Sequence, residues 1–141
     1  MTARPVPKMT LETSPFWDRA RENALSLPRC LQCERLHFPP LHRCPFCSGQ
    51  ELAWTTLSGR GKLKSWTIVY LPTIPGLAPP RTIGEVELLE QSGLTIALLA
   101  DIERGALAID LEVQVAFSHD ENGTAYPFAR PRGGLETGEA A

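Results

Sequence analysis

The spacing of apolar residues divides the chain into a short helical stretch and a longer region of strand-like alternation. Near the N-terminus, apolar side chains recur at helical spacing at Phe16, Ala20, Ala24 and Leu27. Ser14 and Pro15 suit the start of a helix, because Ser caps the free N–H groups and Pro is favoured in the first turn. Pro28 ends the run. The pattern therefore predicts an N-terminal helix over residues 14–27.

From residue 59 onward the period changes to alternation of apolar and polar positions, which is typical of half-buried strands. A proline-rich, semi-rigid loop at 72–80 follows the first strand, and Gln91-Ser92-Gly93 predicts a hairpin turn. The segment 102–108 has room only for a turn or one helical turn. Five short strands with one long loop predict an OB-type Greek-key barrel. The strands are expected at residues 62–71, 83–89, 94–101, 109–118 and 126–130.

Four cysteines, the only ones in the chain, form two Cys-x-x-Cys pairs separated by ten residues: Cys30, Cys33, Cys44 and Cys47. This spacing is typical of a zinc ribbon, because each pair directs two thiolates at one tetrahedral Zn²⁺. Two disulfides in a secreted domain are the alternative. Four thiolates complete the metal shell, so we expect His37 and His42 to be surface or loop residues rather than ligands. A closed four-cysteine site predicts a structural metal.

The predicted division of the chain is a flexible tail (1–13), the helix (14–27), the zinc ribbon (28–55), the OB fold (56–131) and a second flexible tail (132–141). The whole fold is thus expected to be mainly β. No long apolar run is present, and the first residues lack the apolar centre of a signal peptide. We therefore expect no membrane partner and a reducing, cytoplasmic location, where thiolates bind metal rather than form disulfides.

The net charge of −2 conceals an asymmetry between the two parts of the chain. Residues 1–64 carry ten Lys or Arg and five Asp or Glu, giving +5. Residues 65–141 carry four and eleven, giving −7. The acidic second part argues against bulk attraction to nucleic acid, whereas a local anion site in the first part is compatible with the charge.

Short blocks of sequence, in a defined order over residues 14–131, resemble a known family. The chain is similar to small acyl-CoA-associated proteins that join an N-terminal helix, a rubredoxin-like zinc ribbon and a C-terminal OB fold. Two departures are Glu34, where the family has Gly, and Leu41, where it has Arg after Pro-Pro. The matching blocks are Pro15-Phe16-Trp17, Leu27-Pro28-Arg29-Cys30-Leu31-Gln32-Cys33, Phe38-Pro39-Pro40, Arg43-Cys44-Pro45-Phe46-Cys47, Leu52-Ala53-Trp54, Leu57-Ser58-Gly59-Arg60-Gly61, Ser65-Trp66-Thr67, Glu85-Val86-Glu87-Leu88 and Pro127-Phe128-Ala129-Arg130-Pro131.

The resemblance implies an accessory, non-catalytic subunit of a thiolase-like enzyme: a β-ketothiolase, an acyl-CoA condensing enzyme or an aldolase. Such a subunit stabilises its partner and helps to form the channel for the acyl-CoA thioester, while the partner supplies the nucleophile and the acid–base group. The helical stripe with Phe16 and Trp17 packs either on this chain or on that partner; our assembly hypothesis is the partner. We expect no catalytic role for His119, which lies in a turn sequence.

Three cations on one predicted strand are candidate contacts for the phosphates of coenzyme A: Arg60, Lys62 and Lys64. An exposed edge strand protected by Lys explains the same residues without a ligand. Single-stranded nucleic acid is an alternative partner, because Trp66 and Tyr70 are able to stack on bases. An iron protein is another alternative, and colour separates the metals, since Zn²⁺ is colourless whereas a ferric tetrathiolate is red.

Overall fold

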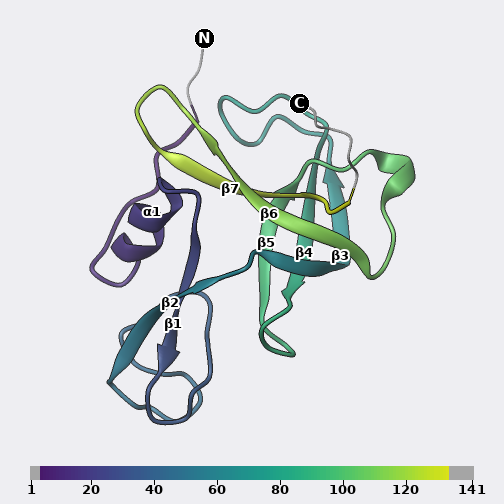
Figure 1. Cartoon of the computed structure of the whole chain (residues 1–141). Helices are drawn as coiled ribbons and strands as arrows, with labels where there is room; N and C mark the ends of the chain where they lie inside the picture. The colour runs from purple at the N-terminus through teal and green to yellow at the C-terminus, as the bar shows by residue number, and fades with distance from the viewer. Residues whose placement is uncertain (1–3, 134–141) are drawn as a thin grey trace.

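The computed structural model describes residues 4–133 and has the mainly β fold expected from the sequence. Figure 1 shows a small lobe with two strands beside a larger barrel, with a short helix packed near both. The elements are α1 (Ser14–Ala20), β1 (Leu25–Cys30), β2 (Leu52–Leu57), β3 (Arg60–Val69), β4 (Arg81–Leu88), β5 (Thr95–Ala100), the 3-10 turn η1 (Arg104–Ala106), β6 (Leu111–His119) and β7 (Ala125–Pro131). None of the helices among these residues has the length and apolar character needed to cross a bilayer.

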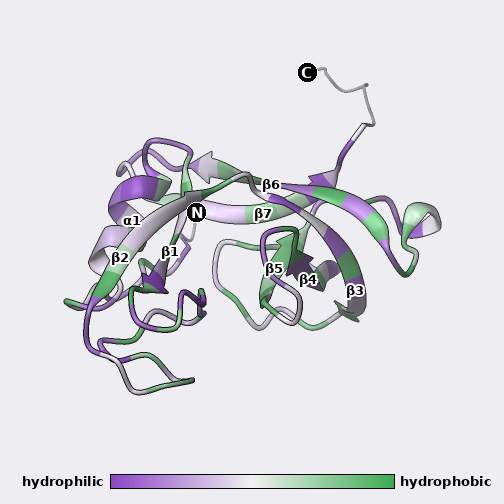
Figure 2. Cartoon of the chain, turned by 60° about the horizontal axis from the view of Figure 1, so that its bottom comes forward, coloured by the Kyte–Doolittle hydropathy of each residue, from purple (hydrophilic) through white to green (hydrophobic). Residues whose placement is uncertain are grey.

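The five strands of the larger lobe form a closed barrel in the order β3-β4-β5-β7-β6. Neighbouring strands are antiparallel except β5 and β7, which run parallel through Leu99↔Phe128 and Ala100↔Ala129. β6 closes the barrel against the first half of β3. This is the predicted five-stranded OB-type Greek key, and η1 is the single helical turn expected between the third and fourth barrel strands. Figure 2 shows apolar and polar bands alternating along β6, as a barrel wall requires.

The predicted helix over 14–27 is too long. The helix ends at Ala20, the chain reverses at Asn23 with φ 63°, and residues 25–30 form a strand paired with β2. Leu25 and Leu27 are both buried, and so is Ser26 between them. Leu27 therefore fitted the helical spacing of α1 by coincidence, although it belongs to a strand.

Phe16 is a core residue of this chain, with only 5% of its surface exposed. Its ring packs edge-on against Trp17, with 5.1 Å between ring centroids, and tilted against Phe38 at 6.2 Å. The helix lies on β1 and β7. Of the two possibilities for the apolar stripe, Phe16 therefore packs on its own chain. The Phe16 side chain is therefore covered by its own chain, whereas Trp17 is half-buried, and a partner contact through the helix stays a prediction.

The described part of the predicted N-terminal tail is anchored rather than loose. The Arg4 guanidinium lies 3.7 Å from the centre of the Tyr126 ring. The Tyr126 hydroxyl donates a hydrogen bond to the carbonyl oxygen of Pro5 at 3.1 Å. These contacts hold the beginning of the described chain against β7. Of the predicted C-terminal tail, residues 134–141 lie outside the described residues.

A side-chain amide joins the zinc ribbon to the barrel. The N–H of Leu36 donates to Oε1 of Gln91, and Nε2 of Gln91 donates to the carbonyl oxygen of Leu36, each at 2.8 Å. Gln91 belongs to the β4–β5 turn, where a hairpin was predicted, and it pairs with Leu36 as a neighbouring strand would. Leu36 is fully buried, so its backbone groups have no access to water there. We call this pair the Gln91 clamp.

Candidate metal centre and cationic surface

The two Cys-x-x-Cys pairs fold as similar tight turns. The N–H of Glu34 donates to the carbonyl of Cys30 at 2.8 Å, and that of Ser48 donates to Cys44 at 2.9 Å. Glu34 and Ser48 both have left-handed backbones, with φ of 68° and 66°. Glu34, where the resembled family has Gly, thus takes a left-handed backbone without the conformational freedom of glycine.

The four sulfurs form one compact group, with all ligand atoms within 4.8 Å of one another. The Sγ–Sγ distances are 3.5 Å between Cys30 and Cys47 and 3.6 Å between Cys33 and Cys44. A tetrahedron with Zn–S bonds of about 2.3 Å has edges of about 3.8 Å, so the sulfurs fit one Zn²⁺. All four thiols are free, so the two-disulfide alternative is wrong for this structure.

Backbone N–H groups donate to two of the sulfurs and favour the ionised form of these two. Cys30 Sγ accepts from the N–H of Gln32 at 3.3 Å and of Cys33 at 3.5 Å, and Cys44 Sγ accepts from that of Phe46 at 3.4 Å. The N–H of Cys33 makes the largest contribution to lowering the pKa of Cys30 to about 7. The pKa of Cys44 is also lowered, by N–H groups that outweigh its burial, whereas the pKa of Cys47 is raised to about 12 because burial and the other three cysteines outweigh the N–H of Gly49. The turns thus favour the metal-binding thiolate form at Cys30 and Cys44.

Sequence reasoning did not single out Gly49, whose backbone packs closely against the metal centre. A Cβ at this position would lie 3.1 Å from Cys30 Sγ and 3.3 Å from Cys47 Sγ, and 3.0 Å from Oε1 of Gln32. The carbonyl of Gly49 also accepts the N–H of Cys44 at 2.8 Å. Its position in the sequence, two residues after the last cysteine, could have identified it, because glycine is favoured where the backbone approaches a ligand group closely.

Neither histidine between the cysteine pairs belongs to the sulfur group. His42 is exposed, as expected, and its Nδ1 lies 3.0 Å from Glu12 Oε2. The expectation of a loop position holds for His37, but this side chain is buried, with only 3% of its surface exposed. The N–H of Leu41 donates to His37 Nε2 at 3.2 Å, and burial lowers the pKa of His37.

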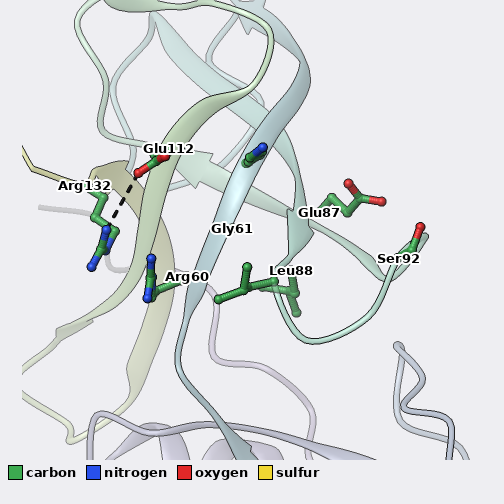
Figure 3. Close-up of a pocket in the computed structure, with 9 residues that line it drawn as sticks. Arg60, Gly61, Glu87, Leu88, Ser92, Glu112 and Arg132 are labelled. Atoms are coloured by element: carbon green, nitrogen blue, oxygen red, sulfur yellow. Dashed lines mark ion pairs between the residues drawn. The ribbon is translucent and has the colours of Figure 1, made fainter.

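The three candidate cations do not all lie at one site. Arg60 and Lys62 are exposed and line a surface cavity of about 290 Å³, shown in Figure 3. Lys64 does not line it, because a bulge in β3 follows Leu63 and the Lys64 ammonium lies 2.6 Å from Asp110 Oδ1. Lys62 stands in register between Glu87 and Glu112. Arg60 and Lys62 pair with β6, so the alternative of a protected edge strand is wrong for these two residues.

Arg132 is a further cation of the same cavity that sequence reasoning missed. In Figure 3 its side chain lies near that of Arg60, and its Nη1 is 3.7 Å from Glu112 Oε1. The N–H of Arg132 donates to the carbonyl of Glu112 at 2.9 Å, which extends the β6–β7 pairing to this residue. Residue 132 had been assigned to a tail, and only the barrel register brings it beside β3.

His119 has a structural partner. Its Nε2 lies 2.7 Å from Oδ1 of Asn23, in the turn that follows α1. The contact links the end of β6 to the turn between α1 and β1. Ser65 donates to the carboxylate of Glu85 at 3.1 Å, so this acidic residue has a local partner on the exposed barrel face. His119 and Glu85 therefore each have a hydrogen-bond partner on the surface of the protein.

The fold and the sulfur group together define a protein made of a zinc ribbon and an OB-fold barrel. The sequence of residues 17–53 matches the domain described as "ChsH2, rubredoxin-like zinc ribbon domain". Residues 54–118 match "ChsH2, C-terminal OB-fold domain". The chain therefore belongs to the ChsH2 family of zinc-ribbon and OB-fold proteins, which is the family that the sequence blocks resemble.

Three curated relatives share part of their length with the chain. A "Probable enoyl-CoA hydratase alpha subunit" of Thermomonospora curvata is 25% identical over 91% of this chain and 40% of its own length. "Benzoylsuccinyl-CoA thiolase subunit BbsA" of Thauera aromatica is 34% identical over 62% of this chain and 58% of its own. A "DUF35 domain-containing scaffold protein" of Pyrococcus furiosus is 28% identical over 74% and 77%. The chain thus spans only about half the length of the first two.

A solved structure has the same fold. The "Ltp2-ChsH2(DUF35) aldolase" contains a chain that superposes with a TM-score of 0.79 at 23% identity, over 89% of this chain and 98% of that one. At this identity the likeness establishes the arrangement of ribbon and barrel and nothing about the reaction.

Proposed function

We propose that the chain is a non-catalytic accessory subunit of a heteromeric thiolase-like enzyme, such as a β-ketothiolase, an acyl-CoA condensing enzyme or an aldolase. In this role it stabilises the catalytic subunit and helps to form the acyl-CoA channel. The observation that carries the proposal is the match of ribbon and barrel, in order, to one family, together with relatives described as subunits of a thiolase and of a hydratase, or as a scaffold.

The position of the cysteines favours a non-catalytic role for this chain. All four thiols of the chain lie in the sulfur group, so a metal there leaves no cysteine as a nucleophile. The residues that would hold a structural Zn²⁺ are Cys30, Cys33, Cys44 and Cys47, and when bound the ion supplies folding free energy rather than catalysis. In this proposal the protein works in the reducing cytoplasm, where these thiolates stay available to metal.

We further propose that the cavity beside β3 contacts the phosphates of coenzyme A. Its cations are Arg60, Lys62 and Arg132, and its carboxylates are Glu87 and Glu112. The carboxylates offset part of the positive charge, so the cavity suits a contact shared with the catalytic subunit rather than an independent site of high affinity. Lys64, the third candidate cation, is paired with Asp110. It would therefore attract the phosphates only through long-range electrostatics, without a direct contact.

Kinetics of the reconstituted enzyme test this proposal. Arg60→Ala with Lys62→Ala should raise KM for acyl-CoA severalfold and leave kcat nearly unchanged, because a phosphate contact far from the reacting bond is uniform binding. The effect should shrink as salt rises, since exposed charges are screened over roughly 8–10 Å. Lys64→Ala is the matched control and should change KM little. A large fall in kcat in the double variant, or turnover by this chain alone, would contradict a supporting role.

A further inference from the structure

The barrel is closed along only part of β3. Residues 60–63 pair with β6 on one side and with β4 on the other. Residues 65–69 pair with β4 alone, and among the described residues no backbone group pairs with their second side. In an antiparallel strand alternate residues direct their N–H and C=O groups to each side. The second half of β3 is therefore an open sheet edge of five residues.

This edge lacks the features that usually prevent pairing. Natural edges carry Lys, Pro or a bulge, and long apolar edges without them associate. A bulge and Lys64 stand just before the open part, but the Lys64 ammonium is turned toward Asp110. Residues 65–69 contain neither a charged residue nor proline. The open edge is thus unprotected over its full length.

The edge continues into an uncharged, exposed segment. Residues 66–80 carry no charged side chain, although 21% of the residues in the chain are charged. Figure 1 shows the loop after β3 extending beyond the end of the barrel. Its prolines restrict the backbone, so the loop would lose little conformational entropy on binding a partner. The exposed fractions of its apolar side chains are high: Trp66 36%, Tyr70 61%, Leu71 70% and Ile74 37%.

We propose that residues 65–77, the β3 edge surface, bind an extended, uncharged segment of the catalytic subunit, which adds to the barrel as a further strand. This inference rests on the proposed function. Backbone hydrogen bonds at the open edge would supply affinity, and the apolar side chains of Trp66, Tyr70 and Leu71 would select apolar residues in that segment. Phe16 of α1 is buried within this chain and offers no docking surface, whereas the half-buried Trp17 stays a separate predicted contact.

Amide hydrogen exchange of the complete chain, alone and in complex, tests the proposal. The complex is purified through a tag on this chain from its native source, the catalytic subunit is identified by mass spectrometry, and both proteins are then recombined in pure form. Outward-facing amides within residues 65–71 should exchange rapidly in the free chain and at least about tenfold more slowly in the complex, because a hydrogen-bonded amide exchanges only through local opening.

A charge on the edge gives an independent measurement. Thr67 is exposed on β3, and Thr67→Lys should weaken binding of the catalytic subunit about tenfold or more, since Lys on an edge opposes strand addition. The matched control is Ala97→Lys, at an exposed position of β5, which β4 separates from the β3 edge surface. This control should bind as the unchanged chain does.

The outcomes separate this inference from the proposed function. If an acyl-CoA enzyme binds while residues 65–71 exchange unchanged and Thr67→Lys binds normally, the β3 edge surface is overturned and the accessory role stands. If no such enzyme binds, both fall. Protection of the edge that depends on the concentration of the free chain would assign it to a second copy. Protection independent of concentration would assign it to the chain itself. Both results overturn the inference.

Discussion

The Gln91 clamp offers the sharpest test of how the ribbon is held on the barrel. The two hydrogen bonds between Gln91 and the backbone of Leu36 join segments 55 positions apart in the sequence. Gln91→Ala removes both bonds without changing the backbone of either lobe. It leaves the N–H and C=O of Leu36 unpaired in a residue that is fully buried.

The structure gives the expected size of this effect. A buried backbone group that loses its only partner costs about 1–3 kcal/mol, whereas the net value of an intact bond is about 0.5–1.5 kcal/mol. Two such groups with partial access to water after the truncation give a loss of about 2–4 kcal/mol. For a chain of this length about 1 kcal/mol corresponds to roughly 3–4 °C, so the melting temperature should fall by roughly 6–16 °C.

Thermal and denaturant unfolding of the metal-loaded protein measures the loss. Gln50→Ala is the matched control, because Gln50 is exposed and should change stability by less than about 0.5 kcal/mol. Gln91→Glu adds a second comparison. Its carboxylate accepts from the N–H of Leu36 but repels the Leu36 carbonyl, so the pKa of the new carboxyl should be raised on folding. Stability of this variant should therefore recover as pH falls through that raised pKa, relative to the unchanged chain.

A Gln91→Ala variant as stable as the Gln50→Ala control would refute the reasoning. It would mean that the shared apolar core alone fixes the ribbon on the barrel. A loss confined to hydrogen exchange of the ribbon, with the barrel unchanged, would instead show that the clamp controls local opening rather than global unfolding.

The metal and the helix give two further predictions. Cys30→Ser should abolish stoichiometric zinc in elemental analysis and unfold the ribbon, because metal binding supplies most of its folding free energy; a folded, metal-free ribbon or a red, iron-containing protein would contradict this. Phe16→Asp should lower the free energy of unfolding by at least about 3–5 kcal/mol and unfold the isolated chain, since it places a carboxylate in the core. Arg21→Asp, at an exposed position, should leave the chain folded. Circular dichroism melts that show a folded Phe16→Asp variant would place the ring outside the core.

The sequence predicted most of the architecture because its strongest signals are local. The cysteine spacing predicted which thiols come together, since a two-residue spacer fixes each pair before the rest of the chain folds. Alternation and turn residues predicted the barrel strands, apart from shifts of a few residues at their ends, such as β3 at residues 60–69 instead of 62–71. The hairpin turn containing Gln91 was likewise a local signal.

What the sequence did not predict depends on long-range pairing. Leu27 fitted the helix period, and only pairing with β2, about 30 positions away, makes it part of a strand. Arg132 joins the cationic cavity through the β6–β7 register. The open half of β3 follows from where β6 begins, at Leu111, which no property of residues 65–69 reveals. Such facts come from the closure of the barrel rather than from any window of sequence.

The burial of Phe16 within its own chain has a physical cause that applies to other small metal domains. A zinc ribbon by itself has too small a core to cover an amphipathic helix, and for this reason a partner was expected there. In the structure one apolar cluster contains Phe16, Leu27 and Leu36 together with Leu63 and Val86 of the barrel. The barrel therefore supplies the cover that the ribbon lacks. Because this core is continuous, the partner has to be sought on surfaces that the two lobes leave uncovered together, and the unprotected half of β3 is such a surface.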